Sequence, residues 1–186
     1  MNVALKKMTV AEFLDWAEAQ PEGRFELVDG QVVAMVQERA LHNLAKMEVT
    51  RALQDGVNAA GLPCTVYTDG MMVEIDEHGA RGPDAILTCG QPIDYDAMIV
   101  ENPLVLVEVV SPTSETRDTD SKLVEYFLIP SVQHYLIFFP HKGVVVHHAR
   151  SIGGGVATEF FYGGVIALNP PGLLLSVDRV LELGRR

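Results

Sequence analysis

Apolar residues recur along the chain at spacings that predict three helices. Thr9 and Glu12 have the spacing of a capping box, in which each side chain accepts a backbone N–H at the start of a helix. They predict a short amphipathic helix over Ala11–Gln20. From Arg39 to Ala60 the apolar positions recur every three or four residues, which is typical of a longer helix. The same spacing predicts a helix over Asp118–Leu128.

Other segments have the alternating or continuous apolar pattern of β-strands. Phe25–Val28 and Gln31–Val36 flank Asp29-Gly30, a dipeptide that favours the positive φ angles of a tight hairpin turn. Leu104–Val110 is apolar on both alternating faces, which predicts a central strand covered on both sides. Further strands are predicted at Cys64–Ile75 (bulged near Gly70), Asp84–Thr88, Gln133–Phe139, Val144–Ala149 and Glu159–Tyr162.

Length and composition favour one α/β domain over residues 1–186. No repeat, low-complexity run or internal linker divides the chain, and domains commonly contain about 100–200 residues. The 48% share of hydrophobic residues is ordinary for a globular protein. The longest apolar stretch contains Glu108 and is far shorter than the roughly 20 residues that a membrane-spanning helix needs. Because the N-terminus lacks the apolar core of a signal peptide, we expect a cytoplasmic protein.

The cysteines and the net charge restrict the kinds of site to consider. Cys64 and Cys89 lack the spacing of a zinc site, so we expect free thiols in a reducing cytosol, with a single disulfide as the alternative. The formal net charge of −11 opposes tight binding of nucleic acid, whose affinity depends on Lys and Arg contacts with phosphates. Clustered carboxylates, in contrast, attract divalent cations.

Two carboxylates and one lysine lie where buried charge would need a partner. Glu108 lies near the C-terminal end of the most hydrophobic predicted strand, where an unpaired carboxylate is costly to bury. Asp84 begins another predicted strand directly after Pro83. Two carboxylates at neighbouring strand ends repel each other unless a cation lies between them. Lys122, one turn into the following helix, could direct its ammonium group to the same place.

The order of these residues resembles the PD-(D/E)XK nuclease superfamily, and within it the large bacterial family of putative restriction endonucleases of the Uma type. The resemblance extends from about Thr9 to Ala149. It is carried by FELVDG (Phe25–Gly30), His42, Pro83-Asp84, LVEVVSPTS (Leu106–Ser114), Asp118, Lys122, Tyr126 and HYLIF (His134–Phe138). The EVVSP block followed by Asp118 and Lys122 is its most specific part.

The resemblance implies a restriction-endonuclease-like core, in which a central mixed β-sheet is flanked by helices, preceded here by the N-terminal helix and β-hairpin. It also implies that Asp84, Glu108 and the backbone carbonyl of Val109 bind Mg²⁺ or Mn²⁺. The superfamily places its lysine two residues after the glutamate, where this chain has Val110. Lys122 fits a relocation of that lysine to the next helix. Such a hydrolase would cut phosphodiester bonds of nucleic acid, DNA above all, to leave 5′-phosphate ends.

Further residues are candidates for accessory roles at the same site. Glu26 and His42 occupy positions where this family often has additional polar residues of the active site, and Tyr126 shares a helix face with Lys122. Each has a simpler interpretation, as an outward-facing hairpin residue, a solvated helix residue and a residue of the core edge. Asp118 is interpreted as a helix cap.

Three functions are compatible with the sequence: a metal-dependent nuclease, a nuclease-like module that binds a partner chain or nucleic acid without cutting it, and a hydrolase of a small phosphoester or nucleotide. The first implies a homodimer, because double-strand cleavage needs two sites. DNA binding despite the net charge would need a local basic patch. The candidates for that patch are Lys46, Arg81, Arg117 and Lys122. The adjacent His147 and His148 should face opposite sides of a strand, so we expect no metal site there.

Overall fold

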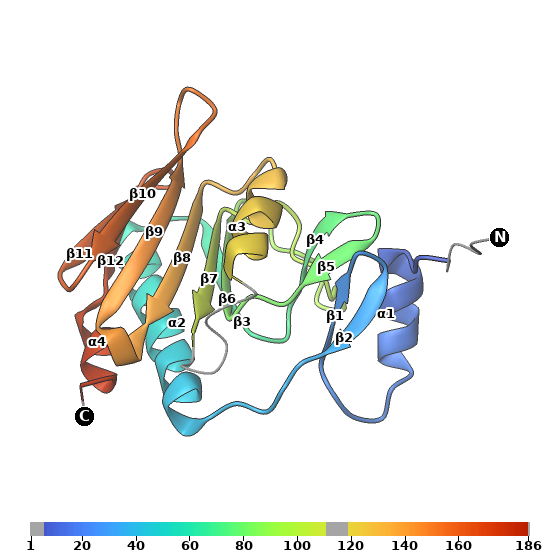
Figure 1. The fold of residues 1–186 in the computed structure, drawn as a ribbon. Helices are drawn as coiled ribbons and strands as arrows, with labels where there is room; N and C mark the ends of the chain where they lie inside the picture. The colour runs from blue at the N-terminus through green and yellow to red at the C-terminus, as the bar shows by residue number, and fades with distance from the viewer. Residues whose placement is uncertain (1–5, 111–118, 186) are drawn as a thin grey trace.

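The computed structural model of the protein describes residues 6–110 and 119–185 (Figure 1). In chain order the elements are α1 (Val10–Glu18), β1 (Phe25–Val28), β2 (Gln31–Ala34), α2 (Ala40–Ala60), β3 (Cys64–Thr68), β4 (Val73–Asp76), β5 (Gly79–Arg81), β6 (Ala85–Cys89), β7 (Val105–Val109), α3 (Thr119–Leu128), β8 (His134–Phe139), the 3₁₀-helix η1 (Pro140–Lys142), β9 (Val144–Arg150), β10 (Val156–Phe161), β11 (Val165–Leu168), β12 (Leu173–Ser176) and α4 (Asp178–Leu183). None of the helices in these two ranges has the length and apolar character needed to cross a membrane.

The N-terminal elements build a small sheet with the strand order β2-β1-β5-β4. The predicted capping box is present at the start of α1, where the side chains of Thr9 and Glu12 each accept a hydrogen bond from the other residue's backbone N–H. β1 and β2 form the predicted hairpin and turn through Asp29 and Gly30, whose φ angles are 49° and 76°. The apolar faces of α1 and this hairpin share one hydrophobic cluster. The predicted N-terminal helix and hairpin are therefore confirmed.

A large sheet carries the main core, and within the described residues its strand order is β10-β9-β8-β7-β6-β3. β7 and β8 are parallel whereas the other neighbouring strands are antiparallel, so the sheet is mixed as predicted. β7 lies inside the sheet, and its side chains alternate between two buried faces. Val105 and Val107 belong to one hydrophobic cluster and Leu106 to the other. Since side chains alternate with a period of two, Glu108 shares the face of Leu106.

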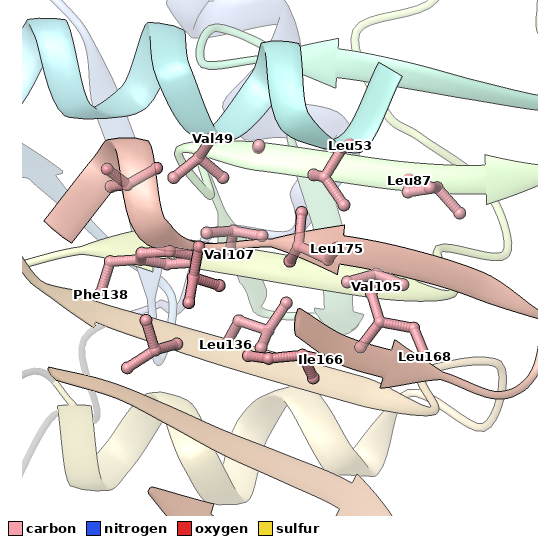
Figure 2. Packing of buried hydrophobic residues seen from close by; sticks show 14 of the residues in the cluster. Val49, Leu53, Leu87, Val105, Val107, Leu136, Phe138, Ile166, Leu168 and Leu175 are labelled. Carbon is pink, nitrogen blue, oxygen red and sulfur yellow. The ribbon is translucent and has the colours of Figure 1, made fainter. Parts of the chain in front are cut away.

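Helices cover both faces of the large sheet (Figure 1). On the face of Val107, Figure 2 shows Val49 and Leu53 of α2 packed over the sheet together with Leu175 of β12. On the opposite face, α3 buries Tyr126 completely. Full burial of an apolar side chain such as Leu53 stabilises the fold by roughly 1.5–3 kcal/mol. These two layers fix α2 and α3 on opposite sides of the end of β7, and this arrangement confirms the central mixed sheet flanked by helices.

The prediction of one bulged strand from Cys64 to Ile75 is wrong. β3 ends at Thr68 in the large sheet, whereas β4 begins at Val73 in the small sheet. Gly70 lies between them with a φ of 106°, a conformation that glycine adopts without steric cost. The chain therefore crosses from one sheet to the other at this point. Periodicity does not predict β5, because its three residues are too few to form a pattern.

The expectation of free thiols is also wrong, because Cys64 and Cys89 form a disulfide. The two residues lie directly opposite each other on the antiparallel strands β3 and β6. Their separation of 25 residues in the sequence gives no sign of this pairing. It is the register between the two strands that brings the sulfur atoms together.

A buried pair of histidines joins the loop between β11 and β12 to the large sheet. His134 Nδ1 lies 2.9 Å from His147 Nε2, and His134 Nε2 lies 2.8 Å from the carbonyl oxygen of Pro170. Because a carbonyl can only accept, His134 Nε2 carries the proton and its Nδ1 accepts from His147. Burial lowers the pKa of both histidines, that of His147 to about 4. His148 faces the other way, as predicted, and lies 2.8 Å from the hydroxyl of Thr158.

Mild acid should weaken this fold through His147. The folded protein keeps His147 neutral down to a pH of about 4, whereas the unfolded chain protonates it near pH 6.5. Between these values the unfolded state binds more protons, so the free energy of unfolding falls as the pH drops. At about 1.4 kcal/mol per pKa unit, urea denaturation at pH 4.5 should show a loss of about 2–3 kcal/mol relative to pH 7 from this residue. His147→Gln should lose correspondingly less; an equal loss in the variant would contradict this role.

Candidate active site

Asp84 and Glu108 lie beside each other at one end of the large sheet. β6 and β7 are antiparallel, and Ala85 lies opposite Val107, so Asp84 and Glu108 are the next opposed pair. The backbone N–H of Val109 donates to Asp84 Oδ2 at 2.6 Å and holds this carboxylate against the end of β7. The negative charge of Asp84 is close enough to raise the pKa of Glu108. The structure thus brings the two predicted acids together.

Glu108 is held by two side chains of α3. Lys122 Nζ lies 2.9 Å from Glu108 Oε1, and the hydroxyl of Tyr126 donates to the same oxygen at 2.6 Å. Lys122 and Tyr126 are four residues apart and therefore share one face of the helix. Burial is the largest cause that raises the pKa of Glu108, to about 7. The charge of Lys122 and the hydrogen bond from Tyr126 oppose this rise, whereas the charge of Asp84 adds to it. Burial and the charge of Glu108 raise the pKa of Tyr126 well above its ordinary value.

Glu26 reaches the site from β1 of the small sheet. Its Oε1 lies 3.4 Å from Lys122 Nζ and accepts a hydrogen bond from the backbone N–H of Gly82 at 3.0 Å. Its Oε2 lies 3.3 Å from Arg81 Nη1. The interpretation of Glu26 as an outward-facing hairpin residue is wrong, because the residue is only 6% exposed. This carboxylate connects the small sheet to Lys122.

The first turns of α2 reach Asp84 from the other layer. His42 Nε2 lies 3.4 Å from Asp84 Oδ2, and Lys46 Nζ lies 3.4 Å from Asp84 Oδ1. Lys46 also pairs with Glu38 and Asp69. Burial lowers the pKa of His42, but the negative charges of Asp84 and Glu38 raise it by more. The pKa of His42 therefore lies above its ordinary value. The interpretation of His42 as a solvated residue is wrong, since its side chain is 17% exposed.

The predicted basic patch does not exist among the described residues. Lys46, Arg81 and Lys122 are all buried and paired with carboxylates. Arg81 binds Glu125 through two hydrogen bonds of 2.7 and 2.8 Å. These buried, paired side chains therefore do not form an exposed basic surface for the phosphates of a bound strand. Arg117, the predicted cap Asp118 and the matched residues 111–114 lie outside the described residues.

The ion pairs around the site form two groups among the described residues. In the group of Lys122, the carboxylates are Glu26, Glu108 and Glu125, and the cations are Arg81 and Lys122. In the group of Lys46, the carboxylates are Glu38, Asp69 and Asp84, and the cations are Arg24 and Lys46. Counted over the described residues, each group has one carboxylate more than it has Lys and Arg side chains. Such clustered carboxylates would attract a divalent cation.

The donors at this site suit a hard divalent cation. Mg²⁺ prefers oxygen ligands and commonly takes only one or two carboxylates from a protein, completing its shell with water. The side chains of Asp84 and Glu108 and the adjacent carbonyl of Val109 offer such a set. Within residues 6–110 and 119–185, no three or more His, Cys, Asp and Glu side chains are arranged to hold a metal ion. A bound Mg²⁺ or Mn²⁺ would have Asp84, Glu108 and the Val109 carbonyl as its candidate ligands from this chain, which are the oxygen donors that these ions prefer.

Sequence reasoning missed three acids of these two groups. Glu125 lies three residues after Lys122 on α3, so helical spacing could have suggested that it lies near the site. Glu38 precedes α2, and no helical spacing places it beside His42. Asp69 follows β3 at the crossing between the two sheets, and no local pattern marks it. Its place beside Lys46 depends on how the sheets pack.

Comparisons with known proteins find relatives along nearly the whole chain. The sequence model of the Uma2 family, described as putative restriction endonucleases, matches residues 10–184. Two uncharacterized proteins of Synechocystis sp. (strain ATCC 27184 / PCC 6803 / Kazusa) are similar to this chain. The protein slr1290 is 24% identical over 174 residues, which cover 92% of this chain and 90% of the relative. The protein sll1609 is 27% identical over 159 residues, which cover 82% of this chain and 86% of the relative. The crystal structure of a putative nuclease from Anabaena variabilis matches with a TM-score of 0.72 at 16% identity, over 95% of this chain and 98% of that one. This likeness shows a shared fold.

Removing the hydroxyl of Tyr126 should destabilise the protein. Tyr126→Phe keeps the fully buried ring but removes a hydrogen bond to Glu108. Hydrogen bonds to charged groups contribute about 1.5–3 kcal/mol, so we expect a loss of that size in urea denaturation at pH 8. Tyr162→Phe, at a tyrosine that is 69% exposed, is the control and should change the stability by less than about 0.5 kcal/mol. Equal stability of Tyr126→Phe and wild type would refute the assigned contact.

Proposed function

Because this chain belongs to the Uma2 family of putative restriction endonucleases, we propose that it is a metal-dependent nuclease whose reaction centre is formed by Asp84, Glu108 and Lys122. One observation carries the proposal: the register of β6 and β7 sets two acids side by side, and Lys122 Nζ lies 2.9 Å from Glu108 Oε1. The proposed reaction is hydrolysis of a nucleic-acid phosphodiester bond to a 5′-phosphate end, with DNA as the substrate that the resemblance favours.

The residues of the chain have distinct tasks in this reaction. Mg²⁺ or Mn²⁺, when bound by Asp84, Glu108 and the Val109 carbonyl, would polarise a phosphate oxygen and lower the pKa of a bound water. The Val109 N–H fixes Asp84, and the Tyr126 hydroxyl fixes Glu108, so neither carboxylate rotates freely. Lys122 orients the attacking water and stabilises negative charge on the phosphoryl group in the transition state.

Neighbouring residues support this centre without contacting the reacting bond. Glu26, itself bonded to the Gly82 N–H, positions the ammonium group of Lys122. His42 and Lys46 hold the far side of Asp84. A two-fold homodimer would supply the second site needed to cut both strands of a duplex. The homodimer and the cytoplasmic location stay predictions.

Hydrolysis of a small phosphoester or nucleotide is the second candidate function. The burial of Lys46, Arg81 and Lys122 and the net charge of −11 favour it, because a small substrate needs fewer phosphate contacts than a duplex. Metal-dependent hydrolysis of bis(4-nitrophenyl) phosphate by a protein that leaves DNA and RNA uncut would decide for this candidate.

Cleavage should depend on the metal, on the carboxylates and on the lysine. We expect the purified protein to cut labelled nucleic acid with Mg²⁺ or Mn²⁺ and to stop when EDTA is added. Asp84→Asn keeps an acceptor for the Val109 N–H but loses the charge, and Lys122→Met keeps the length but loses the ammonium group. Each should lower the rate at least about 100-fold.

The control for these variants is Asp55→Asn, which changes an exposed acid on the same helix as His42 and should cut like wild type. If the wild-type protein cuts neither single- nor double-stranded DNA or RNA with either metal, the proposed nuclease function is wrong.

A further inference from the structure

A cavity of about 210 Å³ lies beside the candidate site at the end of β7. Its apolar walls are Leu41, Val109, Val110 and Pro140, and its polar members include Arg39 and His42. Val109 lines the cavity and also belongs to the candidate site, since its backbone N–H donates a hydrogen bond to the Asp84 carboxylate. Anything bound in this cavity would therefore lie directly next to the reaction centre.

His42 brings an unsatisfied polar atom to this region. Its Nε2 is buried and has no hydrogen-bond partner among the described residues. Asp84 Oδ2 lies 3.4 Å away but is not aligned for a hydrogen bond. Leaving a buried polar atom unpaired is unfavourable, and such atoms in native proteins often belong to functional sites. His42 thus contributes to the lining of the cavity, with its Nε2 beside Asp84.

Arg39 places an unpaired positive charge at the start of α2. It is exposed, its side chain makes no capping hydrogen bond, and it forms no ion pair within the part of the chain that the structure describes. A positive charge at the N-terminus of a helix is electrostatically unfavourable, so helix stability does not explain this residue. A phosphate close to the cavity would be attracted to it.

From these features we propose that the cavity binds one unpaired nucleobase of the strand being cut, so that single-stranded or locally opened nucleic acid is the preferred substrate. The inference rests on the proposed function. Apolar walls beside the charged Arg39 match a nucleotide, whose base has apolar faces and whose phosphate carries a negative charge. The volume is below the roughly 300–1,000 Å³ of pockets for drug-sized ligands, which suits one base. A paired base could enter only by leaving the duplex stack.

Two single strands of equal charge test the proposal: a dye-labelled thymidine hexanucleotide and an abasic hexanucleotide with the same phosphates. Their affinities for the full chain are measured by fluorescence anisotropy in EDTA, so that no strand is cut. Stacking of one base contributes about 1–3 kcal/mol, so the thymidine strand should bind at least about fivefold more tightly. Leu41→Ala removes part of the apolar wall and should abolish most of this difference.

Leu44→Ala is the matched control, since Leu44 lies on the same helix and is 44% exposed, against 37% for Leu41, but does not line the cavity. It should keep the preference for thymidine. Equal affinity for the two strands, no binding of either, or equal effects of both substitutions would overturn the proposal. A preference lost only in Leu41→Ala supports the cavity even if no strand is ever cut, in which case the nuclease function alone fails. Cutting of duplex and abasic strands as fast as thymidine strands would overturn the cavity and leave the nuclease function intact.

Discussion

The repulsion between the Asp84 and Glu108 carboxylates, at one end of the neighbouring strands β6 and β7, is the interaction on which the rest of the site depends. Asp84 and Glu108 are opposed by strand register, so neither can move away from the other without breaking the sheet. Both side chains are largely buried, and burial together with the charge of Asp84 raises the pKa of Glu108 to about 7. Such a pair persists in a folded protein only where cations and hydrogen-bond donors compensate it.

Each layer of the fold supplies one part of that compensation. α3 provides Lys122 and a tyrosine hydroxyl, α2 provides Lys46, and the small sheet provides the glutamate that fixes Lys122. Within the part of the chain that the structure describes, each of the two groups of ion pairs still has one carboxylate more than it has Lys and Arg side chains. We interpret this excess of carboxylates as the property that prepares the site for a divalent cation.

Local sequence signals predict most of the elements but not the contacts between layers. The capping box at Thr9, the Asp29-Gly30 turn and the apolar β7 strand each have a short-range physical cause, and each is found where it was predicted. The crossing at Gly70 and the disulfide follow from sheet packing and strand register, which leave no periodic trace in the sequence. For the same reason the sequence indicates the acids and the lysine of the site but does not predict their partners. Lys46, Arg81 and Lys122 of the predicted basic patch are buried in ion pairs with carboxylates.

Calorimetric titration with Mn²⁺ at pH 8, where Glu108 is largely ionised, tests the central claim most directly. We predict that the wild-type protein binds a single Mn²⁺ per chain, and that Asp84→Asn and Glu108→Gln, which retain most of the shape of each side chain, each lose at least about tenfold in affinity. Wild-type affinity in either variant, or a wild-type protein that takes up no ion, would contradict a metal site between these two strands.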